Sequence, residues 1–215
     1  MSNLRGLYAI TPAAPNPRMP LVRQVALAIA GGARVIQYRD KSANDPVPAQ
    51  GRRLAQAQAL LAVCRAAGVP LIINDDPALA AAVGSDGVHL GREDLAPTEA
   101  RRLLGPGAII GVSCYDRLDL AEAAQAAGAD YVAFGSFFPS STKPLAVRAD
   151  LGLLRRARQC IRLPLVAIGG ITPENGAAVI TAGADLLAVI SGVFGEPDPL
   201  AAARNYARLF DTSHP

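Results

Sequence analysis

Residues 128–136 read Gly-Ala-Asp-Tyr-Val-Ala-Phe-Gly-Ser, and this order of residue types decides the fold. An Ala-rich stretch with helical character, residues 118–127, ends just before it. A glycine after a helix permits the left-handed turn that sends the chain back into a sheet. The apolar run that follows shows little polar alternation, as expected of a parallel strand covered on both faces. The stretch therefore predicts a helix, a glycine turn and a buried strand, followed by a polar loop.

The same unit recurs along the chain. Similar turns at 32–33, 84–86 and 183–185 each close a helical stretch before an apolar run. The apolar runs are residues 7–11, 35–39, 71–75, 87–90, 109–113, 131–135, 165–169 and 186–190, and the clearest helical stretches are 21–30, 49–67, 118–127, 150–160 and 174–182. Eight strands alternating with helices predict an α/β fold, a single-domain (β/α)₈ TIM barrel over residues 1–215, with a disordered tail at 212–215. An open doubly wound sheet is the alternative, but its usual Gly-rich loop after the first strand is replaced here by Thr-Pro-Ala-Ala-Pro.

Composition excludes several classes of protein. The net charge of +3 is modest for 215 residues, there is no Trp, and no Lys/Arg cluster interleaves with aromatic residues, so we expect no nucleic-acid partner. No charged-then-apolar leader opens the chain and no apolar run approaches ~18 residues, so we expect a soluble, cytoplasmic protein without a membrane partner. The three cysteines (Cys64, Cys114 and Cys160) match no zinc or disulfide pattern, as in a reducing compartment. A homo-oligomer is compatible with the sequence.

Three polar residues mark the carboxyl end of the second predicted strand, where barrels of this kind place their working groups. Gln37, Arg39 and Lys41 stand at alternate positions, so their side chains are expected to project the same way. Two cations and an amide that converge form a site for phosphate or pyrophosphate. The alternative is a solvated edge strand that shows its polar face to water.

Two carboxylates follow the next two predicted strands. Asp75 and Asp94 are expected to share one Mg²⁺, which takes one or two carboxylates and completes its shell with water and phosphate oxygens. The alternative is helix capping. Capping suits Asp76, which precedes Pro77, better than Asp75, whereas for Asp94 both interpretations stay open.

The glycine-rich turns after the seventh and eighth predicted strands, at 169–170 and 190–192, predict a cup of backbone N–H groups for a phosphate monoester. Tight turning alone is the alternative. Lys143, in a Ser/Thr-rich loop, could reach either anion, although a solvated loop lysine is the commoner case. His89 lies inside the fourth predicted strand, where we expect a packed, hydrogen-bonded structural histidine, and no nucleophile–histidine set can be assembled.

Taken in order, these residues resemble the thiamine-phosphate synthase family. Each match is weak by itself, but the ordered set spans much of the chain. The matching stretches are Tyr-Ala-Ile-Thr at 8–11, Gln-Tyr-Arg-Asp-Lys at 37–41, Ile-Asn-Asp at 73–75, residues 86–94, Gly-Val-Ser at 111–113, residues 128–143, Ala-Ile-Gly-Gly-Ile at 167–171 and Val-Ile-Ser at 189–191.

The resemblance implies a Mg²⁺-dependent transferase on a (β/α)₈ barrel. It would join 4-amino-2-methyl-5-(diphosphooxymethyl)pyrimidine to 4-methyl-5-(2-phosphoethyl)thiazole through a pyrimidine cation, giving thiamine phosphate and pyrophosphate without a general base. It implies that the pyrimidine diphosphate is held by Gln37, Arg39, Lys41, Asn74, Ser113 and Lys143, of which Arg39, Lys41, Ser113 and Lys143 would be catalytic. It further implies that the thiazole phosphate is held by Ser140, Thr142, Gly170, Ile190 and Ser191, and Mg²⁺ by Asp75 and Asp94. The chain departs from the family at Ser140, often Thr, and at Arg92, often Gln.

Two alternatives on the same barrel stay open. A thiazole tautomerase paralogue would use a histidine near the end of the fifth strand, where residues 113–115 read Ser-Cys-Tyr. A non-catalytic phosphate-binding regulator would keep the glycine-rich cup and lose the cations and carboxylates, all of which are present.

Overall fold

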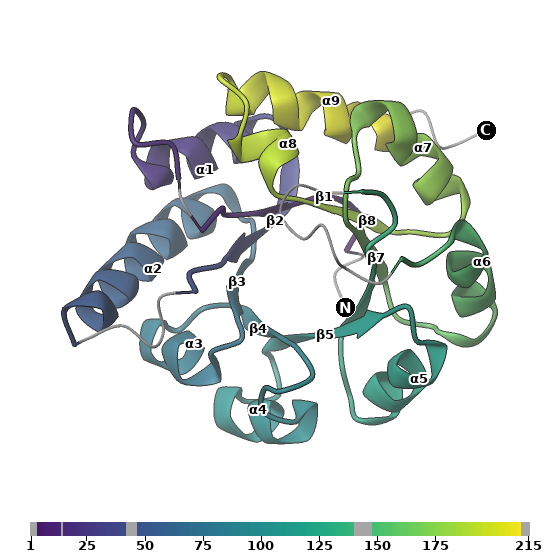
Figure 1. The fold of residues 1–215 in the computed structure, drawn as a ribbon. Coiled ribbons are helices and arrows are strands. Elements are labelled where there is room, and N and C mark those ends of the chain that lie inside the picture. The colour runs from purple at the N-terminus through teal and green to yellow at the C-terminus, as the bar shows by residue number, and fades with distance from the viewer. Residues whose placement is uncertain (1–3, 14, 42–46, 140–147, 212–215) are drawn as a thin grey trace.

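The computed structural model describes residues 4–13, 15–41, 47–139 and 148–211, so the tail at 212–215 lies outside the described residues. Within them, parallel strands close into a barrel in the order β1 to β8 (Figure 1). The strands are β1 Gly6–Ile10, β2 Ala33–Tyr38, β3 Leu71–Asn74, β4 Gly87–Leu90, β5 Ile109–Tyr115, β6 Tyr131–Phe134, β7 Leu165–Ile168 and β8 Leu186–Val189. The predicted (β/α)₈ barrel is confirmed, and the open doubly wound sheet is wrong because β1 pairs with β8.

Helices form a ring around the barrel (Figure 1). They are α1 Leu21–Ala30, α2 Val47–Ala67, α3 Pro77–Val83, α4 Pro97–Leu104, α5 Leu118–Ala126, α6 Leu151–Cys160, α7 Pro173–Thr181, α8 Ser191–Phe194 and α9 Pro199–Asp211. The sequence analysis missed α9, which buries Ala203 and Tyr206 and packs against α1 and α7. None of the helices traced in the described ranges combines the length and apolar character that crossing a bilayer requires.

Strand side chains are buried on both faces, which explains the missing alternation in the sequence. One face packs inside the barrel, where an apolar cluster includes Tyr8, Val35, Ile72, Tyr131, Val166 and Leu186. The other face packs against the helices, where the larger cluster includes Leu7, Ile36, Leu71, Val132 and Leu187. Gln37, Asn74 and Ser113 stand an even number of residues after inward-facing positions. Their side chains therefore continue the interior series up to the carboxyl rim.

The recurring glycine turns adopt the predicted left-handed conformation, with φ of 65° at Gly84, 82° at Gly128 and 119° at Gly183. An aspartate stands two residues after each of these three glycines and accepts a hydrogen bond from the backbone N–H at the start of the preceding strand. The pairs are Asp86 with Leu71 at 2.8 Å, Asp130 with Ile110 at 2.7 Å and Asp185 with Leu165 at 2.8 Å. The repeat is therefore a device that ties the amino ends of neighbouring strands together, on the side of the barrel where stability rather than chemistry is expected.

We predict that Asp130→Ala lowers the free energy of unfolding by about 1–3 kcal/mol, because it leaves the Ile110 N–H without its acceptor. The carboxylate also pairs with Arg101 at 2.5 Å. Urea unfolding measures the change, and Asp119→Ala is the control, because Asp119 forms an exposed ion pair with Arg117 that should contribute little. Equal stability of the Asp130 and Asp119 variants would contradict the assigned role.

Candidate functional site

Gln37 is held rigidly at the end of β2. Its side chain is 3% exposed, and Nε2 donates to the Tyr8 hydroxyl at 2.8 Å. Arg39 follows the strand, and its backbone N–H donates to Thr11 Oγ1 at 2.9 Å, which ties this segment to β1. The alternative of a solvated edge strand is wrong, because β2 lies between β1 and β3 in a closed barrel.

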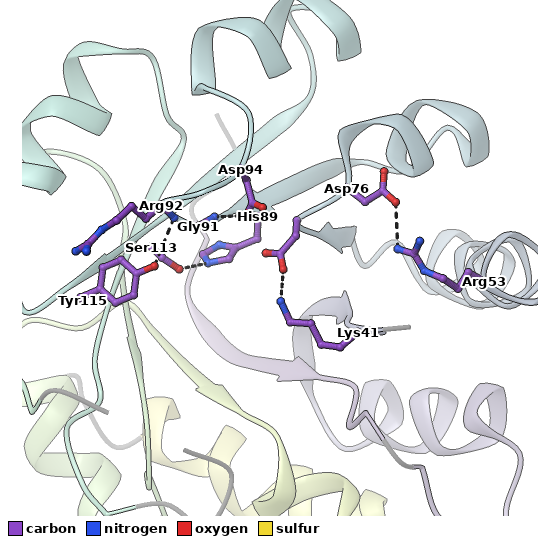
Figure 2. A network of polar contacts seen from close by, with 10 residues as sticks. Lys41, Arg53, Asp76, His89, Gly91, Arg92, Asp94, Ser113 and Tyr115 are labelled. Carbon is purple, nitrogen blue, oxygen red and sulfur yellow. Dashed lines mark hydrogen bonds and ion pairs between the residues drawn. The ribbon is translucent and has the colours of Figure 1, made fainter. Parts of the chain in front are cut away.

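Lys41 meets Asp75 across the rim. The Lys41 Nζ forms an ion pair with Asp75 Oδ2, between the ends of β2 and β3. Figure 2 labels Lys41 and marks this ion pair with a dashed line. Asp75 has φ of 63°, a left-handed backbone that non-glycine residues adopt at a cost of about 1–2 kcal/mol. Its backbone N–H donates to the His89 carbonyl at 2.8 Å, which helps hold this conformation. The fold thus places at the site a carboxylate whose residue has a strained backbone.

Helix capping is the role of Asp76 but not of Asp94. Asp76 caps α3 as predicted, since its Oδ1 accepts from the Leu79 N–H at 2.9 Å, and its Oδ2 pairs with Arg53. Asp94 does not cap α4, whose N-cap position is Ala96 and has no side-chain cap. Instead Asp94 Oδ2 accepts from the Gly91 N–H at 2.6 Å within the loop after β4 (Figure 2).

Asp75 and Asp94 lie close enough to affect one another's ionisation, and their pKa values move apart. Burial disfavours the charge of Asp75, but the Lys41 ammonium outweighs this effect and lowers the pKa of Asp75. Burial raises the pKa of Asp94, and the nearby negative charge of Asp75 raises it further. The hydrogen bond from the Gly91 N–H acts in the opposite direction and lowers it. The two carboxylates raise one another's electrostatic cost, and a divalent cation between them would offset it.

The donor set fits Mg²⁺. No group of three or more His, Cys, Asp or Glu side chains that could cage a metal is found in the ranges described. Two carboxylates beside a cationic anion site are what Mg²⁺ uses when substrate phosphates and water complete its shell. A structural zinc site, by contrast, needs four nitrogen or sulfur ligands. The pair is therefore suited to a metal that arrives with a phosphorylated substrate.

The end of β5 forms the next part of the rim. Its pairing with β6 shifts register between Ser113 and Tyr115, and Tyr115 has φ of 54°. Ser113 Oγ lies 2.8 Å from His89 Nε2. Arg92, where the family often has Gln, stacks its guanidinium 5.1 Å from the centre of the Tyr115 ring (Figure 2). The extra cation is therefore turned onto an aromatic ring, a contact that the sequence analysis missed.

The two glycine-rich turns lie where the cup was predicted. Gly169 and Gly170 follow β7 with φ of 104° and 61°. A side chain at Gly170 would place its Cβ 2.3 Å from the Pro139 carbonyl oxygen, so this position requires glycine. After β8, Ile190 is the N-cap of α8 and Ser191 its first residue. Ser140, Thr142 and Lys143 lie outside the described residues, whereas Asn74 is the half-buried last residue of β3.

Comparison with known proteins identifies the family of this chain. Residues 7–193 match the family described as thiamine monophosphate synthase. A thiamine-phosphate synthase of Thioalkalivibrio sulfidiphilus is 55% identical over 208 residues, covering 97% of this chain and 96% of the relative. One from Azoarcus is 56% identical over 207 residues, covering 96% and 98%.

One solved structure resembles this chain in both sequence and fold, and a second resembles it in fold alone. A thiamine phosphate pyrophosphorylase from Pyrococcus furiosus superposes with a TM-score of 0.82 at 35% identity, covering 97% of this chain and 96% of that one. A 3-hexulose-6-phosphate synthase superposes with a TM-score of 0.66 at 19% identity, which shows the barrel fold alone. With the family match and relatives above 50% identity over nearly the whole length, the chain belongs to the thiamine-phosphate synthase family.

Proposed function

We propose that this chain joins the aminopyrimidine methyl diphosphate to the thiazole phosphate, forming thiamine phosphate and releasing pyrophosphate. The observation that carries the proposal is the meeting of Lys41, Asp75 and Asp94 at the carboxyl rim of a barrel that belongs to this family. A thiazole tautomerase or a non-catalytic regulator has no need for this set, and the similar proteins compared above are synthases.

In this proposal the carboxyl rim of the barrel binds two anions at two separate places. Arg39 and Lys41 take the diphosphate, together with Asn74 and Lys143. Mg²⁺ held by Asp75 and Asp94 would neutralise charge on the diphosphate oxygens when it is bound. The backbone N–H groups of the turns after β7 and β8, at Gly170, Ile190 and Ser191, take the thiazole phosphate with Ser140 and Thr142.

The charges then account for the reaction. The ring amino group stabilises a cation at the pyrimidine methyl carbon, so the bond from that carbon to the diphosphate oxygen breaks and leaves its electrons on oxygen. Cations already in place stabilise the charge that develops there. The thiazole nitrogen, held close by its own phosphate, supplies the electron pair for the new bond. A general base has no proton to remove, so this reaction does not need the hydrogen-bonded pair of Ser113 and His89 as a nucleophile and base.

The deciding experiment incubates the purified chain with both substrates and Mg²⁺ and measures thiamine phosphate and pyrophosphate together. The proposal requires the two products in equal amounts, and omission of either organic substrate should abolish both. Conversion of a thiazole tautomer without pyrophosphate would identify the tautomerase instead. We further propose a cytoplasmic location, since Cys64, Cys114 and Cys160 are free thiols, as a reducing compartment allows.

We predict that Arg39→Ala lowers kcat about 10²-fold, because it removes one preorganised donor from the leaving diphosphate. Steady-state rates with each substrate varied in turn measure the effect. Arg34→Ala is the matched control, because Arg34 is an exposed arginine near the amino end of the same strand. An Arg39 variant that only raises the KM for the thiazole phosphate, with kcat intact, would contradict the assignment.

A further inference from the structure

A continuous chain of buried hydrogen bonds crosses the barrel interior beneath the site. It begins at Gln37, whose Nε2 donates to the Tyr8 hydroxyl at 2.8 Å. The Tyr8 and Tyr131 hydroxyl oxygens lie 2.7 Å apart, and the Tyr131 oxygen lies 3.0 Å from His89 Nδ1. The chain ends at Ser113, whose Oγ lies 2.8 Å from His89 Nε2. It therefore joins two rim residues through three that stand on β1, β6 and β4.

The packing of β4, β5 and β6 makes this chain possible. Gly111 of β5 stands in register between His89 of β4 and Tyr131 of β6. A Cβ at Gly111 would lie 1.9 Å from the Tyr131 Cζ, so only glycine leaves room for the ring. The His89 and Tyr131 rings consequently stack across β5, with centroids 5.6 Å apart and planes 15° from parallel. The contact between the two rings therefore requires glycine at position 111.

The contacts allow one consistent direction along this chain. Burial raises the pKa values of Tyr8 and Tyr131 far above the ordinary value, so each phenol keeps one proton to donate. In the direction that we infer, the Tyr8 oxygen accepts from Gln37 and its own O–H donates to Tyr131. Tyr131 in turn donates to His89 Nδ1, which accepts only when the imidazole carries its proton on Nε2.

The direction of the hydrogen bonds extends to Ser113 at one end of the chain and to Gln37 at the other. In the inferred direction His89 Nε2–H donates to Ser113 Oγ, so the Ser113 proton is directed away from the imidazole and toward the rim. At the other end, Gln37 donates one of its two amide N–H groups to Tyr8, which fixes the orientation of the amide and turns Oε1 away from Tyr8 as an acceptor. A buried, satisfied network of this kind fixes orientation more firmly than isolated bonds do.

We propose that Tyr8, Tyr131 and His89 are positioning residues that set Gln37 as an acceptor and Ser113 as a donor before the substrate binds. A pyrimidine with an exocyclic amine and ring nitrogens offers the complementary pair, so the ring enters a site whose hydrogen-bond sense is already chosen. This inference deepens the proposed function and rests on it for the identity of the ring. The direction of the network itself does not depend on which molecule binds.

The direction is tested without substrate. The chain has two histidines, His89 and His214, so a His214→Gln variant labelled with ¹⁵N-histidine reports on His89 alone. Imidazole ¹⁵N shifts and two-bond couplings distinguish the tautomers, and we expect the proton on Nε2. Tyr131→Phe in the same background should convert this signal to a mixture of tautomers, because the donor to Nδ1 is lost. A proton on Nδ1, or a tautomer unaffected by Tyr131→Phe, would overturn the proposal.

The effect on the reaction is tested by kinetics. Tyr131→Phe should lower kcat/KM for the pyrimidine diphosphate about tenfold, in the range of losses known when residues that orient ligands are removed. The KM for the thiazole phosphate should stay within about twofold, since that phosphate is held by other strands. Tyr38→Phe is the control, because Tyr38 stands beside Gln37 but donates to Gln56 in the helix layer at 2.8 Å.

The outcomes separate the two claims. Equal kinetics of the Tyr131 and Tyr38 variants would reduce the network to a packing role and overturn the inference, although the wild-type reaction would still stand. No product from the wild-type chain would remove the proposed function, whereas the His89 tautomer would still report whether the network has its direction.

Discussion

Asp75→Asn is expected to lower kcat about 10³-fold and to raise the Mg²⁺ concentration that half-saturates the enzyme, since one of the two carboxylates proposed to hold Mg²⁺ and the partner of Lys41 are lost together. The low pKa of Asp75 keeps its carboxylate ionised at neutral pH, so the variant removes a charge that is present under working conditions. Asparagine tolerates the left-handed backbone that Asp75 adopts, and the fold should therefore survive the change.

Titration of activity against Mg²⁺ measures this effect, and thermal unfolding checks the fold. Glu93→Gln is the matched control, because it removes a carboxylate charge from an exposed position next to Asp94. It should change neither kcat nor the Mg²⁺ requirement. If Asp75→Asn keeps wild-type activity at limiting Mg²⁺, Asp75 is not a metal ligand and its strained backbone needs another explanation.

The second large effect concerns the substrate. An electron-withdrawing substituent on the pyrimidine, such as fluorine in place of methyl hydrogens, destabilises the proposed cation. Destabilisation of the transition state by about 4 kcal/mol slows the step about 10³-fold. Changes in the nucleophilicity of the thiazole should matter far less. The reason lies in the site: Lys41 and Arg39 are assigned to the leaving diphosphate, and no described residue is assigned to activate the thiazole.

Single-turnover rates decide this point, because they report chemistry rather than product release. The matched comparison uses the fluorinated and unfluorinated pyrimidines at saturating thiazole phosphate. A rate that ignores fluorination and depends steeply on the thiazole would mean direct displacement. In that case the diphosphate site would serve binding more than bond breaking.

Much of the fold followed from local patterns. Glycine turns before apolar runs predicted the strands and their parallel order, because a left-handed turn after a helix has few other uses. Both the capping role of Asp76 and the packed, bonded state of His89 were predicted and are confirmed. The helix α9 closes the helix ring against α1. It was not predicted, because no apolar strand pattern follows it in the sequence.

The site was predicted only in part, because contacts between strands depend on closure. Alternation put Gln37 on the same side as Arg39 and Lys41, but nothing local indicates that its amide meets Tyr8 or that Arg92 lies on Tyr115. The bulge after Ser113 and the left-handed backbone of Asp75 are likewise set by neighbouring strands.

The sequence by itself determined the barrel, the family and which residue types stand at the carboxyl rim, because period-two alternation and turn chemistry act over a few residues. Only the tertiary structure decided how those side chains pair. Asp94 lies against Asp75 rather than capping α4, and His89 reaches Tyr131 across Gly111. Such pairs join residues far apart in the chain, and their geometry exists only once the eight strands have closed and fixed their register.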